Sequence, residues 1–280
     1  MNTDFLYRFG KVEYNLASRT HIMGILNVTP DSFSDGGRYF DIEQAIAHGQ
    51  KLVEDGADFI DIGGESTRPG SELVSIEEEI RRTIPVIEVL AKKVNVPISI
   101  DTYKSEVAEA ALKAGAVIVN DISAITFDEK MASVVAKYHA SVVLMHIKGT
   151  PKTMQENPTY VDVTGEVKQF LHRQTDVAKT AGIKQIIIDP GIGFGKKYEH
   201  NIQLFRELKS FSSLSYPVLV GPSRKSFLGT ILNLPTSERL EGTAAAVAAS
   251  ILNGANIIRV HDVKEMKRVA MVSEALKSDL

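Results

Sequence analysis

The chain has 280 residues, of which 44% are hydrophobic and 24% charged, and its formal net charge is -3. This balance predicts a globular protein with a substantial core and no basic surface wide enough to hold nucleic acid. The absence of cysteine excludes disulfides, thiolate metal sites and cysteine nucleophiles. No run approaches the roughly 20 apolar residues of a membrane span, and residues 1–19 lack the apolar stretch of a signal peptide, so we expect a cytoplasmic protein.

Short runs rich in Val, Ile and Leu recur along the chain and predict eight β-strands, at residues 21–27, 59–63, 97–101, 117–121, 141–146, 185–189, 217–221 and 256–260. Amphipathic stretches between and after them predict eight helices, at residues 41–55, 75–93, 105–114, 128–138, 162–181, 200–211, 236–253 and 265–278. Strands that are apolar almost throughout are typical of parallel strands covered on both faces.

Strict alternation of strands and helices is typical of a closed βα barrel or of a doubly wound open sheet. The number of units, and a length near the roughly 250 residues of a typical barrel, favour an α/β fold with a single (βα)8 TIM barrel over residues 20–280. Residues 1–19 are expected to form a short N-terminal extension, and one form it could take is a hairpin that caps the barrel floor. Gly and Pro cluster after individual strands, so no linker between domains is predicted.

Polar residues end almost every predicted strand, at the rim where a barrel builds its active site. They are Asn27, Asp61, Asp101, Asn120 with Asp121, His146, Asp189, Lys225 in the loop after the seventh strand, and Arg259 with His261. One polar strand end is most often a turn or cap residue, but so many on one rim indicate a functional site. Alternation along the strands predicts that Asp121 points outward as a structural residue and that others face the mouth, namely Asn120, Asp189, Arg259 and His261.

The segment after the first strand, NVTPDSFSDGG at residues 27–37, is long and contains several turn residues. It predicts either a plain surface loop or a mobile lid that carries Phe33 and Asp35 over the site. Asn27 at its base offers a neutral oxygen to a hard cation such as Mg²⁺, which takes few protein ligands beside waters and phosphate oxygens.

Two further segments carry groups that suit an anion. DIGGESTRPG places Thr67 and Arg68 in a Gly- and Pro-bounded loop, where the planar donor fork of Arg68 suits phosphate. RVHDV sets Arg259 beside His261, and this pair together with Arg68 would hold two phosphates.

The polar groups of Asp101, Asn120 and Asp189 suit the edge of a flat heterocycle that carries amino, ring N–H and oxo groups. A buried structural network is the alternative interpretation of these three side chains. The following segment, DPGIGFGKK, is not a Walker A sequence, because Pro190 and Lys197 occupy the positions that need Gly and Ser or Thr. Phe194 in this segment could support a second ring or pack on the helix below.

GPSRKSFLG, which begins at Gly221, places Arg224, Lys225 and Ser226 where a helix is expected to begin. A donor here would serve a ring carbonyl or an anion. Ser226 could equally be an ordinary helix N-cap.

These segments together resemble the dihydropteroate synthase family, and the resemblance runs from about residue 20 to residue 262. They are MGILNVTPDSFSDGG, DIGGESTRPG, ISIDT, VNDIS, DPGIGFGK, GPSRKSFLG and RVHDV. The resemblance implies condensation of 6-hydroxymethyl-7,8-dihydropterin diphosphate with 4-aminobenzoate to give 7,8-dihydropteroate and diphosphate, with Mg²⁺ as cofactor and a homodimer as assembly. The residues 1–19 carry no motif of the family.

The resemblance also assigns roles by position. The pterin would be bound by Asp101, Asn120, Asp189 and Lys225, in a pocket lined by Ile122 and Met145, and Gly221 is expected among the substrate-binding residues. The diphosphate and its metal would be held by Asn27, Arg68, Arg259 and His261. The aminobenzoate site would be shaped by Phe33, Thr67, Phe194 and Ser226. The residues expected to act in catalysis are Asp35, Arg68, Lys225, Arg259 and His261.

Two other functions compete with this one. A pterin-dependent methyltransferase would share the acids and the amide, but it would leave STRPG, GPSRKS and the pair of Arg259 and His261 without an anion to bind. A non-catalytic pterin-binding paralogue would keep the barrel while its anion-binding residues decayed, and here they look intact.

Overall fold

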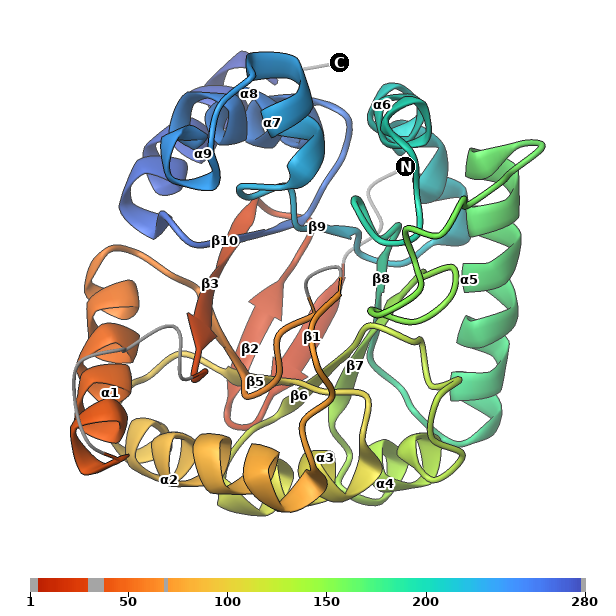
Figure 1. Ribbon diagram of the computed structural model, residues 1–280. Coiled ribbons are helices and arrows are strands. Elements are labelled where there is room, and N and C mark those ends of the chain that lie inside the picture. The colour runs from red at the N-terminus through yellow and green to blue at the C-terminus, as the bar shows by residue number, and fades with distance from the viewer. Residues whose placement is uncertain (1–4, 30–37, 68–69, 278–280) are drawn as a thin grey trace.

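Eight parallel strands form the centre of the molecule in the computed structural model, which describes residues 5–29, 38–67 and 70–277 (Figure 1). The strands are β3 (His21–Asn27), β4 (Phe59–Gly63), β5 (Ile98–Asp101), β6 (Ile118–Asp121), β7 (Ser141–Met145), β8 (Ile186–Asp189), β9 (Leu219–Val220) and β10 (Ile257–Val260). They pair in the order β8-β7-β6-β5-β4-β3-β10-β9. A parallel bridge between Ile188 and Val218 joins the two outer strands, so the sheet is a nearly closed barrel and the predicted TIM-like fold is confirmed.

Helices surround the barrel on its outside, as Figure 1 shows. The α-helices are α1 (Arg38–Glu54), α2 (Ile76–Lys93), α3 (Ser105–Ala114), α4 (Met131–Lys137), α5 (Val163–Thr180), α6 (Tyr198–Arg206), α7 (Ser226–Leu232), α8 (Leu240–Leu252) and α9 (Val263–Leu276). The 3-10 helices are η2 (Leu208–Leu214) and η3 (Thr236–Glu238). No helix in the described ranges is both long and apolar enough to cross a membrane.

The barrel strands divide their apolar side chains between two separate core layers. One layer lies between strands and helices and includes Val119, Ile188 and Val260. The other fills the inside of the barrel and includes Ile118, Ile187 and Ile257, each of which directly precedes a member of the first layer in the sequence. This alternation follows from the period of two along a strand, and it leaves the next inward-pointing residue of each strand at the barrel mouth.

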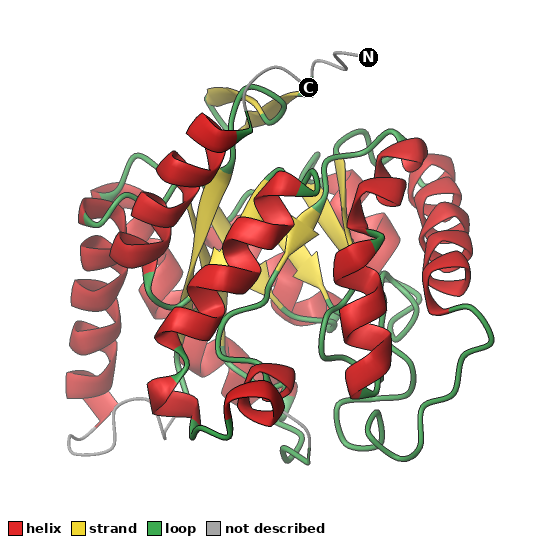
Figure 2. Cartoon of the chain, turned by 90° about the horizontal axis from the view of Figure 1, so that it is seen from above, coloured by secondary structure: helices red, strands yellow, loops and turns green. Residues whose placement is uncertain are grey.

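The N-terminal extension is an antiparallel hairpin of β1 (Leu6–Phe9) and β2 (Val12–Asn15). Figure 2 shows it at one end of the barrel. The ring of Phe9 meets that of Phe59 edge to face, with centroids 5.2 Å apart, inside the inner core layer. The hydroxyl of Tyr7 donates to the carbonyl of Ile186 over 2.7 Å. The hairpin that we expected at the barrel floor is therefore present, and it closes the inner core from below.

Element ends differ from the predictions around the last third of the chain. The predicted helix 200–211 is α6 followed by η2, and the predicted helix 236–253 is η3 followed by α8. The predicted strand 217–221 is reduced to the two residues of β9. The short helix α7 occupies a segment for which only a helix start was expected. The segments η2, η3, β9 and α7 are too short for periodicity to identify.

Candidate active site

A small cleft opens at the carboxyl ends of the strands. Its lining includes Ile192, which was not predicted, and ten residues that were, namely Thr67, Asp101, Asn120, Ile122, Met145, Asp189, Phe194, Gly221, Lys225 and Arg259. A larger groove lies at the opposite end, beside the hairpin residue Arg8, and contains none of the predicted residues. The mouth cleft is therefore the candidate active site.

Arg259 on β10 is the centre of a buried polar network in this cleft. Its Nε donates to Asp61 Oδ2 and its Nη2 to Asp101 Oδ2, each over 2.6 Å. Asn120 Nδ2 donates to the same Asp61 oxygen over 2.8 Å. Burial disfavours the guanidinium, but the charges of Asp61 and Asp101 outweigh it and raise the pKa of Arg259. The guanidinium is thus fixed between two carboxylates at the cleft wall.

Asp61 is a site residue that the sequence reasoning left out, although it was noted as a polar strand end. Its side chain is fully buried and touches both Arg259 and Asn120. It does not line the cleft, and its contacts make it a support for two residues that do. The signal that could have found it is its position in β4, one strand away from Asp101 in β5.

The carboxyl groups of Asp101 and Asp189 are held in apolar surroundings that disfavour their charge. Burial raises the pKa of Asp101, and the charge of Arg259 opposes that shift. Burial raises the pKa of Asp189 to about 6, although the backbone N–H of Gly191 donates to its Oδ1 over 2.7 Å. Asp101 Oδ1 is buried without a hydrogen-bond partner in the described part of the chain. A buried acceptor of this kind is suited to a donor supplied by a ligand.

The loop between β8 and α6 is organised around Lys196, whose exposed fraction is 2%. Its Nζ donates to the carbonyls of Gly191 and Phe194 over 2.8 and 3.0 Å, and lies 2.9 Å from His146 Nδ1. Burial lowers the pKa of Lys196 to about 7, and it lowers the pKa of His146 to about 2, so the imidazole is neutral and accepts. The sequence offered no signal for this role beyond the lysine itself.

One wall of the cleft is apolar. Ile122 and Met145 belong to a small buried cluster at the mouth, with Ile147, Met154 and Phe194. The Lys225 Nζ lies 3.8 Å from the centroid of the Phe194 ring, so a cation and an aromatic face stand side by side. The cleft therefore offers an apolar slot with acceptors and donors along its edges.

Three predicted site residues lie outside the lining of this cleft. His261 follows β10, and its Nδ1 lies 2.9 Å from Ser223 Oγ. Ser226 is exposed and is the first residue of α7, while Lys225 is the N-cap residue, so the N-cap interpretation of Ser226 is wrong. Asn27 ends β3 at the mouth, and a Cβ built on Gly63 would stand 3.8 Å from its Oδ1.

Asp121 has the structural role expected of it. Its Oδ1 accepts from the backbone N–H and hydroxyl of Ser123, and its Oδ2 accepts from the backbone N–H of Ile125. Three other predicted site residues, Phe33, Asp35 and Arg68, lie outside the described residues.

The chain was compared with protein families, curated proteins and solved structures. Residues 23–261 match the family described as pterin binding enzyme. The dihydropteroate synthase of Synechocystis sp. is 50% identical over 270 residues, which is 95% of this chain and 93% of that protein. A structure of Xanthomonas albilineans dihydropteroate synthase with 4-aminobenzoic acid superposes with a TM-score of 0.92 at 42% identity, covering 99% of this chain and 100% of that one.

A second Xanthomonas albilineans structure, in complex with 7,8-dihydropteroate, superposes with a TM-score of 0.89 at 40% identity, covering 98% of this chain and 100% of that one. These similarities extend over nearly the whole chain in both sequence and fold. Six of the seven segments that carry the sequence resemblance supply residues to the lining of the cleft. The chain belongs to the dihydropteroate synthase family of pterin binding enzymes.

Proposed function

We propose that the chain condenses 6-hydroxymethyl-7,8-dihydropterin diphosphate with 4-aminobenzoate to give 7,8-dihydropteroate and diphosphate in folate biosynthesis. The observation that carries the proposal is one cleft that collects acids, an amide and cations from four strands and one loop, namely Asp101, Asn120, Asp189, Arg259 and, in the loop before α7, Lys225. Membership of the dihydropteroate synthase family supports it.

The pterin is assigned to the polar edge and apolar wall of the cleft. A pterin carries amino and N–H donors along one edge, and the carboxylates of Asp101 and Asp189 are acceptors for them. The amide of Asn120 and the ammonium of Lys225 complete the pattern, because one donates and accepts and the other donates to the ring carbonyl. Ile122 and Met145 would cover a ring face.

The diphosphate is assigned to Arg68, Arg259 and His261, with Mg²⁺ as cofactor. The described residues contain no cluster of three acidic or His side chains that would form a dedicated metal cage. Asn27 at the end of β3 offers one neutral oxygen beside Gly63, which fits a cation that completes its shell with waters and phosphate oxygens. When bound, Mg²⁺ would neutralise charge on the departing diphosphate.

The reaction requires that the site stabilise the departing diphosphate anion and the positive charge that develops on the pterin methylene carbon. The C–O bond breaks with its electron pair on the diphosphate, the amine nitrogen forms the new C–N bond, and the amine then loses a proton. Cations at the diphosphate lower the barrier to departure, and the carboxylates of Asp101 and Asp189 favour positive charge growing on the pterin. The aromatic amine is neutral at about pH 7, so no strong base is required.

The 4-aminobenzoate is assigned to the outer part of the cleft. Thr67 and Phe194 line the cleft and are assigned to this part of it, and Phe33 and Ser226 are proposed beside them. Asp35 is proposed to act with the cations Arg68, Lys225 and Arg259 in catalysis.

A homodimer is part of the proposal. Exposed apolar side chains gather on the last three helices, and they include Ile231, Leu232, Leu240, Leu252, Met271, Val272 and Leu276. Such a surface suits a second copy of the chain. The cytoplasmic location stays a prediction.

The test is diphosphate release from the purified chain with both substrates and Mg²⁺, with 7,8-dihydropteroate identified by mass spectrometry. Turnover that needs both substrates is the expected result. Saturable pterin binding without turnover would instead indicate a binding paralogue, and methyl transfer from a reduced pterin would indicate a methyltransferase.

A further inference from the structure

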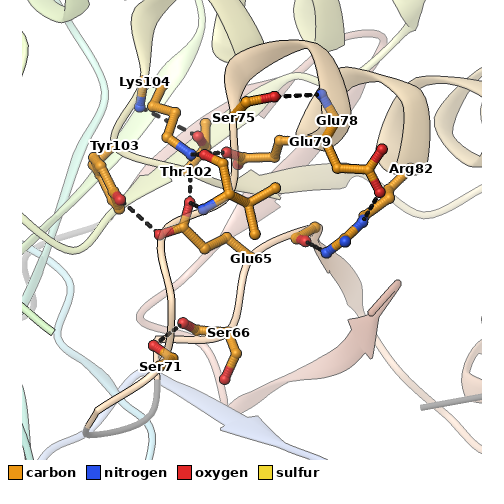
Figure 3. A network of polar contacts seen from close by, with 12 residues as sticks. Glu65, Ser66, Ser71, Ser75, Glu78, Glu79, Arg82, Thr102, Tyr103 and Lys104 are labelled. Carbon is orange, nitrogen blue, oxygen red and sulfur yellow. Dashed lines mark hydrogen bonds and ion pairs between the residues drawn. The ribbon is translucent and has the colours of Figure 1, made fainter. Parts of the chain in front are cut away.

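A second buried polar cluster lies beside the cleft and takes no part in the chemistry described above. It consists of Glu65, Glu79, Tyr103 and Lys104, which we call the Lys104 cluster, and Figure 3 shows it. The side chains of Glu65, Glu79 and Lys104 are 5%, 1% and 14% exposed. Groups of this kind are rarely buried unless each is paired, so the cluster is a built feature of the fold.

Lys104 is the hub of the cluster. Its Nζ donates to Glu79 Oε2 and to the carbonyl of Val74, each over 2.6 Å, and it also donates to Glu65 Oε2. The three acceptors use all three N–H donors of the ammonium. Within the cluster, Lys104 is the one cation that pairs with Glu65 and Glu79, because the remaining member is a tyrosine.

Two of the three acceptors of Lys104 belong to opposite ends of one loop, and the third, Glu79, lies in α2. Glu65 lies near its start and Val74 near its end, and the loop connects β4 to α2. Between them the loop carries Thr67, which lines the cleft. Lys104 therefore ties the two ends of that loop together at a single atom.

Tyr103 joins this tie to the wall of the pterin pocket. Its hydroxyl donates to Glu65 Oε1 over 2.6 Å, and its ring packs against the apolar cluster that contains Ile122 and Met145. Tyr103 thereby connects the β4–α2 loop to the apolar wall that is assigned to the pterin. The loop start also packs closely against α2 at Gly64, since a Cβ there would come within 2.8 Å of Thr83 Cγ2.

The charges make Lys104 indispensable to this arrangement. Two buried carboxylates share one ammonium, and burial raises the pKa of Glu79 even though Lys104 opposes the shift. Without the ammonium, the two carboxylates would repel each other, and the carbonyl of Val74 would lose its donor. The ends of the loop would then separate or rotate, and Thr67 would move with them.

We infer that Lys104 is a positioning residue that sets the amine-binding part of the cleft by tying the β4–α2 loop to the wall of the pterin pocket. This inference rests on the proposed function for the identity of the two substrates. It predicts that loss of Lys104 affects 4-aminobenzoate far more than the pterin diphosphate.

The test compares Lys104→Met and Glu65→Gln with wild type in steady-state assays. Lys104→Met is expected to raise the KM for 4-aminobenzoate by at least roughly tenfold while the KM for the pterin diphosphate stays within about twofold. Glu65→Gln keeps the shape and the acceptor for Tyr103, so it is expected to give a smaller rise of the same kind. Lys137→Met is the matched control. It breaks an exposed ion pair in which Lys137 Nζ lies 2.7 Å from Glu109 Oε1, and this pair is not part of the cleft or of the Lys104 cluster.

Hydrogen exchange of residues 70–75 provides a readout that needs no turnover. Faster exchange there in Lys104→Met, and not in Lys137→Met, supports the inference. This result does not depend on turnover, so a wild type without synthase activity would contradict only the proposed function. Unchanged exchange at residues 70–75 overturns the inference. An equal rise of both KM values also overturns it, because that pattern indicates general destabilisation. If Lys104→Met does not fold, the same two criteria apply to Glu65→Gln.

Discussion

The ammonium of Lys225 stands 3.8 Å from the centroid of the Phe194 ring. The two residues come from different loops, one after β8 and the other before α7, and each lines the cleft. The contact keeps a flexible lysine over one aromatic face, and it links a residue assigned to the pterin with one assigned to the amine. A change at Phe194 should therefore be felt at both substrates.

Replacing Phe194 with leucine tests this link. Phe194→Leu keeps the side chain apolar but removes the ring, and a cation–π contact contributes about 0.5–2 kcal/mol. We expect the KM for 4-aminobenzoate to rise several-fold and pterin affinity to fall by a smaller factor. Phe194→Tyr keeps the ring and should stay close to wild type. Equal kinetic constants for wild type and Phe194→Leu would show that the ring has no such role.

Removing the guanidinium of Arg259 should cost both stability and activity. Arg259→Met leaves Asp61 and Asp101 buried without their cation, and breaking a buried pair costs about 3–5 kcal/mol in free energy of unfolding. Because protonation relieves a stranded carboxylate, the loss should be greater at about pH 8 than at about pH 5. Urea unfolding at both pH values measures it, with the exposed Arg173→Met as control. A pH-independent loss would contradict the argument.

Pterin affinity should depend on pH through Asp189. Its pKa is raised from 3.8 to about 6 by burial, so the carboxyl is largely protonated below about pH 6 and then cannot accept from two donors. We expect the Kd for a pterin to fall as pH rises from about 5 to about 7, by at most about tenfold per unit for one proton. Asp189→Asn should remove that part of the dependence, and any remainder reports on Asp101. Calorimetry at several pH values provides the measurement.

The same shift has a consequence for stability with the opposite sign. The folded chain holds the Asp189 proton more tightly than the unfolded chain, so the free energy of unfolding should decrease as pH rises between about 4 and about 6. The difference in free energy of unfolding between wild type and Asp189→Asn should therefore be smallest below this window, grow across it and stay constant above it. A difference that grows toward acid would reverse the sign and refute the assignment.

Gly191 should be irreplaceable for a reason that its backbone angle alone does not supply. Its φ is +70°, and a Cβ would lie 1.9 Å from the carbonyl oxygen of His146. Gly182 has a φ of +93° but nothing within 4 Å of its Cβ position, which makes Gly182→Ala the matched control. Gly182→Ala should cost about 1–2 kcal/mol for the left-handed backbone. Gly191→Ala should cost clearly more and abolish pterin binding, and equal melting temperatures for the two variants would exclude the clash.

The hairpin should contribute to stability and leave the chemistry unchanged. Phe9 is 2% exposed in the inner core, and truncating a buried Phe costs about 3–5 kcal/mol. Phe9→Ala should lower the melting temperature strongly, while Leu6→Ala, at a side chain that is 60% exposed, should not. Turnover per folded molecule should be similar in both. A selective loss of kcat in Phe9→Ala would show that the floor influences the mouth.

Much of the fold and of the cleft follows from local patterns. The strand-end positions of Asn120, Asp189 and Arg259 were predicted because side chains alternate along a strand, and the inner and outer core layers confirm that alternation. Parallel strands bring such ends to one rim whatever their distance in the sequence. For these residues, local pattern and overall topology are consistent.

Other features depend on packing that no local pattern encodes. Asp61 and Lys196 are polar residues whose roles come from buried partners far away in the sequence, and only the folded chain shows which partners those are. Helix α7 is too short for its periodicity to be distinguished from a loop. The break between η3 and α8 likewise has no strong signal in the residues around Arg239, whose guanidinium bonds the carbonyl of Leu234.

The hairpin under the barrel also determines from which side small molecules reach the cleft. With aromatic rings packed at the floor and aliphatic side chains filling the inside of the barrel, the described residues close the cleft on its floor side, and it opens at the mouth. Both substrates would therefore enter the cleft, and both products would leave it, at the mouth. Retained dihydropteroate would therefore block the next round, and it should compete with the incoming pterin diphosphate.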